Sequence, residues 1–247
     1  MSIGELHANH RRGTCGPALL MSIWCCLLLL SAACGDRRRA EPVSKARQME
    51  RAADRRPEAA TDDRPVIVAL GDSLTAGFGV DPEQNYPARL QRKLDEGGYR
   101  YRVVNMGVSG DTSAQGLNRL AAARELRPAV VIVALGANDG LRGLPLDATR
   151  DNLEAILRAL KEDGCKVVLA GMEIPPNYGP EYTRDFRALF PELARRYRAA
   201  LIPFLLEGVG GRPELNQEDG IHPTGQGYRI ITENVWRILQ PLLDRNP

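Results

Sequence analysis

From about Pro65 onward, short apolar runs alternate with longer amphipathic stretches. Each apolar run is rich in β-branched residues, which favours a strand. The five runs are Val66–Leu70, Tyr101–Val104, Val130–Leu135, Val167–Ala170 and Leu201–Phe204. The amphipathic stretches place apolar residues at helical spacing, so each predicts a helix. They are Tyr86–Leu94, Ala114–Leu126, Asn152–Lys161, Tyr182–Ala199 and Gly225–Leu243.

The alternation of five strands with five helices predicts an α/β fold. Strands that alternate with helices form a parallel sheet, and right-handed crossovers cover both of its faces with helices. Ligands bind such a sheet beyond the carboxyl ends of its strands. Functional residues are therefore expected in the loops that follow the strands.

The pattern divides the 247-residue chain into three parts. Residues 1–34 resemble an export signal, with Arg11 and Arg12 ahead of an apolar run from Pro17 to Leu30 and small residues before Cys34. Residues 35–64 are charged and rich in Ala, Arg and Glu, which predicts a disordered linker. Residues 65–247 remain as the globular domain.

The leader leaves three outcomes open. An uncleaved leader would act as a membrane anchor, because its apolar run is at the short end of the length that spans a bilayer. Cleavage would leave either a soluble exported protein or a protein lipidated on Cys34. Small residues directly precede Cys34, as they do in lipoprotein signals. We expect export to the periplasm or attachment to the bacterial cell envelope, with membrane association through the N-terminus. The sequence indicates no oligomeric state.

Charge excludes one class of partner. The formal net charge is +2, with 33 Lys and Arg residues against 31 Asp and Glu residues. The basic residues are interspersed with acidic ones and form no stripe, so the chain lacks the electrostatic pattern of a nucleic-acid-binding protein.

Four loops after predicted strands or before the last helix carry unusual chemistry. They are Gly71–Gly77, Asn105–Thr112, Gly136–Gly140 and Asp219–Pro223. If the sheet is parallel, all four lie along one edge of it.

His222 is the only histidine in the predicted domain, since the other two of the chain's three lie in the leader. A histidine-rich metal site is therefore excluded, and any histidine-dependent catalysis must use His222. A lone histidine is more often structural. Here, however, Pro223 marks a helix entry, and Asp219 is three residues away across a turn. Asp219 can orient the imidazole so that its other nitrogen accepts a proton, although a turn carboxylate is the simpler alternative.

Ser73 directly follows the first predicted strand in a glycine-bracketed loop, so a histidine within reach would make it a nucleophile. Ser109 is a weaker candidate, because Thr112 and Gln115 resemble a capping box that starts a helix there. Oxyanion donors would be the N–H groups of Ser73 and Gly110 and the amide of Asn138. For Asn138, a simple Asn-Asp-Gly turn explains the residue equally well.

The four segments together resemble the sequence blocks of the SGNH, or GDSL-type, hydrolases. The blocks are Gly71-Asp72-Ser73-Leu74, Ser109–Ser113, Asn138–Gly143 and Asp219–Pro223. The resemblance spans nearly the whole domain and is strongest to the branch of thioesterase I, lysophospholipase L1 and arylesterase. It implies a flavodoxin-like α/β/α sandwich with five parallel strands. It also implies Ser73, Asp219 and His222 as the triad and Ser73, Gly110 and Asn138 as oxyanion donors, with no metal or other cofactor.

The resemblance also implies the substrate. We expect a serine esterase or thioesterase that acts on short-chain or aryl esters, acyl thioesters or lysophospholipids through an acyl-enzyme on Ser73. Asp72, Pro176, Asn177 and Tyr178 are expected to contact the substrate, within a loop from Glu173 to Tyr182 that lines the acyl pocket. A carbohydrate O-acetyl esterase is the alternative within enzymes. A phosphate- or flavin-binding domain and a catalytically inert envelope lipoprotein are the alternatives outside them.

Overall fold

The computed structural model describes residues 62–245. The predicted leader, Cys34 and most of the predicted linker lie outside the described residues. Among the described residues, the structure contains no helix that is both long and apolar enough to cross a membrane.

The predicted parallel sheet is confirmed. Its five strands are β1 (Val66–Gly71), β2 (Arg102–Gly107), β3 (Val130–Ala134), β4 (Lys166–Ala170) and β5 (Ala200–Ile202). They lie in the order β2-β1-β3-β4-β5, and every neighbouring pair is parallel. All side chains of β1 and β3 are buried, as expected for central strands covered on both faces.

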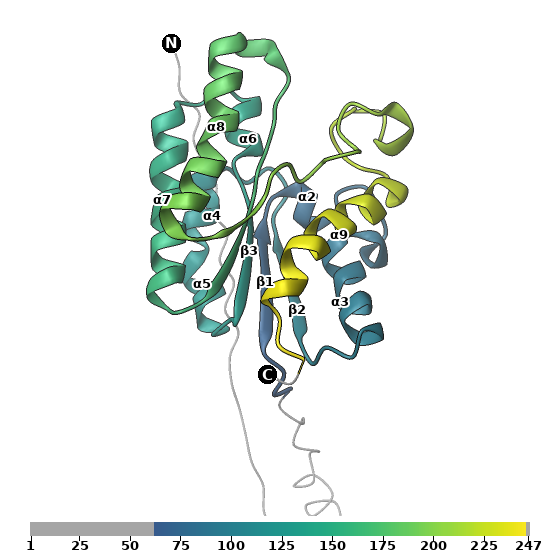
Figure 1. The fold of residues 1–247 in the computed structure, drawn as a ribbon. Coiled ribbons are helices and arrows are strands. Elements are labelled where there is room, and N and C mark those ends of the chain that lie inside the picture. Colours follow the sequence, from purple (N-terminus) through teal and green to yellow (C-terminus); the bar gives the residue numbers. More distant parts are fainter. Residues whose placement is uncertain (1–61, 246–247) are drawn as a thin grey trace, which may run out of the picture. The chain divides into compact units, whose positions relative to one another are not determined.

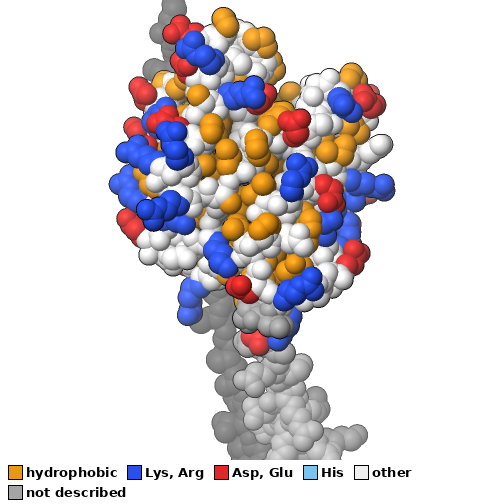
Figure 2. All heavy atoms as spheres, viewed as in Figure 1, with side chains coloured by type: hydrophobic (Ala, Val, Ile, Leu, Met, Phe, Trp, Pro, Cys, Tyr) orange, Lys and Arg blue, Asp and Glu red, His pale blue; other side chains and the backbone are white. Residues whose placement is uncertain are grey.

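Helices cover both faces of the sheet, with α3 and α9 on one side and α4, α5, α7 and α8 on the other (Figure 1). The helices are α2 (Ser73–Ala76), α3 (Tyr86–Glu96), α4 (Ser113–Asn118), α5 (Leu120–Glu125), α6 (Ala137–Leu141), α7 (Leu146–Glu162), α8 (Pro180–Tyr197) and α9 (Gly225–Leu239). This three-layer arrangement confirms the predicted fold class. On the face in Figure 2, hydrophobic side chains form a central band, with basic and acidic side chains mixed around it.

Several predicted elements differ in detail from the structure. The stretch expected as one helix over Ala114–Leu126 is two helices, because the chain turns at Arg119 between α4 and α5. Short helices α2 and α6 occupy segments expected as loops. β5 ends before Pro203, which has no N–H group with which to continue the ladder.

Strand register aligns the functional loops. Gly71, the last residue of β1, pairs with Gly107 of β2 on one side and with Ala134 of β3 on the other. The loops after β1, β2 and β3 therefore leave the sheet side by side, at the edge where parallel α/β proteins bind ligands.

Candidate active site

Ser73 is the first residue of α2 and is separated from β1 by Asp72 alone. The Asp72 carboxylate caps this helix by accepting a hydrogen bond of 3.0 Å from the Leu74 N–H. Ser73 is nearly buried, yet it lines a cavity at the carboxyl edge of the sheet. The strand-to-helix turn thus presents its hydroxyl to a ligand.

The absence of a side chain at Gly107 lets α2 rest on the end of β2. A Cβ atom at Gly107 would lie 2.2 Å from the backbone nitrogen of Ala76, which is closer than atoms approach without displacement. Beneath α2, the hydroxyl groups of Thr75 and the buried Tyr86 are 3.1 Å apart. Packing from two sides therefore fixes the helix that carries Ser73.

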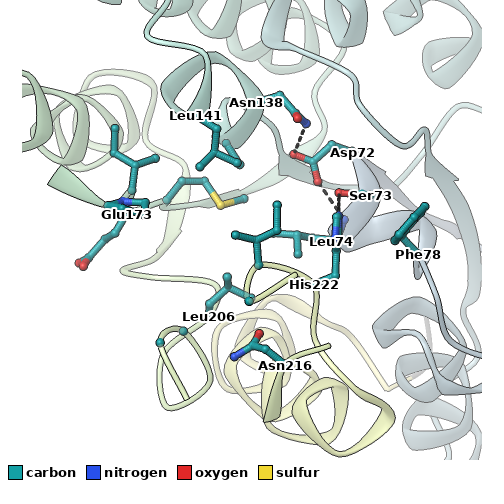
Figure 3. Close-up of a pocket in the computed structure, with 18 of the residues that line it drawn as sticks. Asp72, Ser73, Leu74, Phe78, Asn138, Leu141, Glu173, Leu206, Asn216 and His222 are labelled. Carbon is teal, nitrogen blue, oxygen red and sulfur yellow. Dashed lines mark hydrogen bonds between the residues drawn. The ribbon is translucent and has the colours of Figure 1, made fainter. Parts of the chain in front are cut away.

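His222 joins Ser73 to Asp219. Its Nε2 atom is 2.9 Å from Ser73 Oγ, a contact drawn in Figure 3. Its Nδ1 atom is 2.6 Å from Asp219 Oδ2. The Asp219 carboxylate accepts from Nδ1–H, so Nε2 carries the lone pair that faces the serine hydroxyl. The structure thus brings together the three residues expected to form the triad.

The Asp219 side chain stabilises the Asp219–His222 turn by binding backbone N–H groups within it. Asp219 Oδ1 accepts hydrogen bonds of 3.0 Å from the N–H groups of Ile221 and His222. Gly220 has a φ of +74°, a left-handed conformation that favours glycine. The hydrogen bond from the His222 ring, with further help from these N–H groups, lowers the pKa of Asp219 to about 2. Asp219 is therefore a carboxylate at neutral pH.

Phe78 is a site residue that sequence reasoning missed. Its ring centroid lies 4.6 Å from that of His222, and both residues line the cavity. The two rings are inclined by 39°, and this aromatic contact restricts the imidazole. Only the position of Phe78 after the Ser73 loop could have indicated this role.

Three hydrogen-bond donors expected for an oxyanion line the same cavity: Ser73, Gly110 and Asn138. Within residues 62–245, the N–H groups of Ser73 and Gly110 have no protein acceptor. The Asn138 Nδ2 group donates to the Asp111 carbonyl at 3.0 Å and makes a longer contact of 3.5 Å with Asp72 Oδ2. The contact with Asp72 is at the outer limit of a hydrogen bond, so it is the weaker of the two.

Asp139 fixes the segment that carries Asn138. Its buried carboxylate accepts hydrogen bonds from the Ser113 N–H at 2.8 Å and from the Ser113 hydroxyl at 2.5 Å. The Thr149 hydroxyl donates to it at 3.3 Å. Asn138 therefore sits in a braced helix, α6, and not in the simple Asn-Asp-Gly turn considered as its alternative explanation.

Ser109, the rival nucleophile, lines the cavity but makes no hydrogen bond to His222. The predicted capping box after it is confirmed, since Thr112 and Gln115 exchange hydrogen bonds at the start of α4. The loop that contains Ser109 therefore contributes backbone geometry, and the histidine faces Ser73.

The cavity has a volume of about 520 Å³ and a mostly apolar lining. The apolar residues are Leu74, Phe78, Ala137, Leu141, Met172, Ile174, Pro175, Phe204, Leu206 and Ile221. The loop after β4 contributes Met172, Glu173, Ile174 and Pro175. Asp72 also reaches the lining.

The other residues expected to contact substrate lie outside this lining. Pro176 and Asn177 are exposed on the same loop. The Tyr178 hydroxyl instead donates to the Leu141 carbonyl at 3.2 Å, and the Tyr178 ring lies against Gly143. Phe204 and Leu206 follow β5 and line the cavity. The apolar pattern of the sequence does not tell whether such side chains face the cavity or the core.

The donor set of the site is suited to proton transfer and not to metal binding. Across residues 62–245, no group of three or more His, Cys, Asp or Glu side chains is arranged to hold a metal ion. A hydrogen-bonded serine, histidine and aspartate at the edge of a parallel α/β sheet is the arrangement of a serine hydrolase.

Comparison with known proteins agrees with that class. Residues 69–230 match the GDSL-like Lipase/Acylhydrolase family, and the chain belongs to this family. It is 46% identical over 178 residues to Esterase TesA of Pseudomonas aeruginosa, a match that covers 72% of this chain and 89% of that protein. It is 38% identical over 181 residues to Thioesterase 1/protease 1/lysophospholipase L1 of Escherichia coli, covering 73% of this chain and 86% of that protein. The crystal structure of TesA superposes with a TM-score of 0.70 at 45% identity, over 72% of this chain and 99% of that one.

Asp72 is an unusual carboxyl group because it is completely buried beneath the site. Burial is the main cause that raises the pKa of Asp72 to about 7. The folded state therefore binds a proton more tightly than the unfolded chain, whose aspartates titrate near pH 4. The contribution of Asp72 to the free energy of unfolding is therefore largest at low pH, and it decreases as the pH rises toward 7.

We predict that Asp72→Asn flattens this pH dependence. Between pH 5 and pH 8, the wild type should lose about 2–3 kcal/mol of unfolding free energy that the variant keeps. Asparagine can still cap α2, so the comparison tests the charge. Denaturant unfolding at both pH values measures the slope, with the exposed Asp81→Asn as control. Equal slopes for wild type and Asp72→Asn would show that Asp72 does not titrate in this range.

Proposed function

We propose that Ser73 hydrolyses acyl esters and thioesters through a covalent acyl-enzyme. The observation that carries this proposal is the His222 ring, which is hydrogen-bonded to Ser73 Oγ on one side and to Asp219 on the other. A serine hydroxyl is a weak nucleophile unless a base within hydrogen-bond distance takes its proton. His222 is such a base, and Asp219 holds it in the required tautomer.

In the first step, Ser73 Oγ attacks the acyl carbonyl carbon while its proton passes to His222 Nε2. The C=O bond becomes a C–O⁻ single bond in a tetrahedral intermediate. His222 then returns the proton to the leaving alkoxide or thiolate, the bond to the leaving group breaks, and the acyl group remains on Ser73. The Asp219 carboxylate stabilises the transient imidazolium.

The developing oxyanion receives hydrogen bonds from the Ser73 and Gly110 N–H groups and from the Asn138 amide. Donors that are already oriented stabilise the transition state without reorganisation, and loss of one such donor costs about 10²–10³ in kcat. In the second step, His222 takes a proton from water, the hydroxide oxygen attacks the acyl carbon, and the proton passes to Ser73 as the acid leaves.

The apolar cavity supports an acyl chain as the recognised part of the substrate. Its lining is mostly apolar, and Figure 3 shows Asp72, Ser73, Asn138 and His222 together at one side of the cavity, with the polar residues Glu173 and Asn216 apart from them. The relatives are named as an esterase and as a thioesterase and lysophospholipase, which favours acyl esters, thioesters and lysophospholipids for this chain over acetylated carbohydrate. Substrate contacts from Pro176, Asn177 and Tyr178 would require that their loop close over a bound ligand.

We also infer that the protein is exported to the periplasm or anchored in the cell envelope, with its N-terminus as the point of membrane association. Support comes from the leader pattern that ends in small residues before Cys34. Mass spectrometry of the mature N-terminus tests this inference. A chain that begins at Cys34 with added acyl mass would support anchoring, whereas an intact N-terminus would contradict cleavage.

We predict that Ser73→Ala lowers kcat for p-nitrophenyl butyrate by about 10³-fold or more, because the nucleophile is lost. Ser109→Ala serves as the matched control, since Ser109 lines the same cavity without contact to His222. It should keep kcat within a few fold. Steady-state kinetics and circular dichroism on both variants make the comparison. Retained turnover in folded Ser73→Ala would contradict the proposed nucleophile.

A further inference from the structure

The Arg119 side chain is partly buried, with 26% of its surface exposed, and lies where α4 ends and α5 begins. Its Nε atom donates to Asp111 Oδ2 at 2.7 Å, and its Nη2 atom lies 2.6 Å from the same oxygen. Nη1 donates to the Met106 carbonyl at 2.9 Å, and Nη2 donates to the Gly71 carbonyl at 3.2 Å. One guanidinium group thus binds three separate segments of the chain.

Each of these acceptors is close in sequence or space to an expected oxyanion donor. Gly71 ends β1, two residues before Ser73, and Met106 lies near the end of β2, before the Gly110 loop. Asp111 directly follows Gly110, and its carbonyl oxygen accepts the hydrogen bond from Asn138 Nδ2. The three donors come from different segments, and the contacts of Arg119 reach all three.

We propose that Arg119 is a positioning residue that sets the geometry of the oxyanion-binding groups. The inference rests on the proposed function of Ser73, and Arg119 itself touches neither substrate nor reacting atoms. Through Gly71 it holds the strand end that leads to Ser73, and through Asp111 it holds both the Gly110 loop and the carbonyl that orients Asn138. An error of about 1 Å in such positions lowers rates by about 10²-fold.

The planar fork of arginine is essential to this role. Its donors point in fixed directions, so one side chain binds a carboxylate and two carbonyl groups at once. Lysine places a single ammonium group there and cannot reproduce the three directions, although it keeps the positive charge beside the buried Asp111. Arg119→Lys therefore separates geometry from charge compensation.

The structural alternative is that Arg119 only neutralises Asp111. In that case, Arg119→Lys would keep kcat and alter stability alone. If Arg119 positions the donors, kcat should fall by about 10–100-fold while KM changes by less than about threefold, because the oxyanion contacts act in the transition state and not in the bound substrate.

Steady-state kinetics with p-nitrophenyl butyrate on Arg119→Lys and Asp111→Asn test the proposal, well below the melting temperature of each variant. Arg124→Met is the matched control, because Arg124 lies on α5 and pairs at the surface with Asp163. It should leave kcat and KM within about twofold of the wild type.

A phenylboronic acid, which forms a tetrahedral adduct with an active-site serine, supplies a second measurement. Its affinity should fall by the same factor as kcat in Arg119→Lys, whereas binding of butyrate, the reaction product, should change little. An unchanged kcat and boronate affinity, or a loss that lies entirely in KM, would overturn the proposal.

The experiments distinguish a failure of the role proposed for Arg119 from a failure of the function proposed for Ser73. Turnover that survives in Ser73→Ala would remove the basis for both inferences. An inactive Ser73→Ala together with a fully active Arg119→Lys would overturn the role of Arg119 alone. If Arg119→Lys fails to fold, the same split between kcat and KM is measured in Asp111→Asn, which keeps the backbone carbonyl but weakens the ion pair.

Discussion

The hydrogen bonds on the two sides of the His222 ring are the interactions on which the site depends. One reaches Ser73 at 2.9 Å, and the other reaches Asp219 at 2.6 Å. Ser73 lies at the start of α2 and His222 just before α9, so these two bonds join the beginning and the end of the fold. Further polar contacts, such as those of Asp139 with Ser113 and of Arg119 with Asp111, hold the loops that carry the expected oxyanion donors.

The parallel sheet makes that meeting possible. Pairing of Gly71 with Gly107 and Ala134 brings three strand ends level, and the loops that leave them carry Ser73, Gly110 and Asn138. The loops themselves are held by buried polar contacts, with Arg119 bound to Asp111 and Asp139 bound to Ser113. Buried polar groups of this kind are stable only when they are paired, so the loops have few alternative conformations.

Much of the fold and triad was readable because local patterns determine them. β-branched runs indicated the strands, and one histidine near Asp219 left a single candidate for the base. The break at Arg119 was missed because the apolar spacing continues through it, whereas the backbone N–H of Arg119 bonds to the Gly116 carbonyl three residues earlier. The cavity lining from Met172 and Phe204 was missed for a similar reason, since tertiary packing decides whether an apolar side chain faces core or cavity.

In the site described above, His222 activates Ser73 and no other nucleophile. Reaction of the unmodified protein with a fluorophosphonate, followed by digestion and mass spectrometry, tests it most directly, because the reagent forms a stable adduct with an activated serine. We expect one adduct per molecule, located on Ser73, and none when His222 is replaced by alanine. An adduct on Ser109, or labelling of Ser73 that persists without His222, would contradict it.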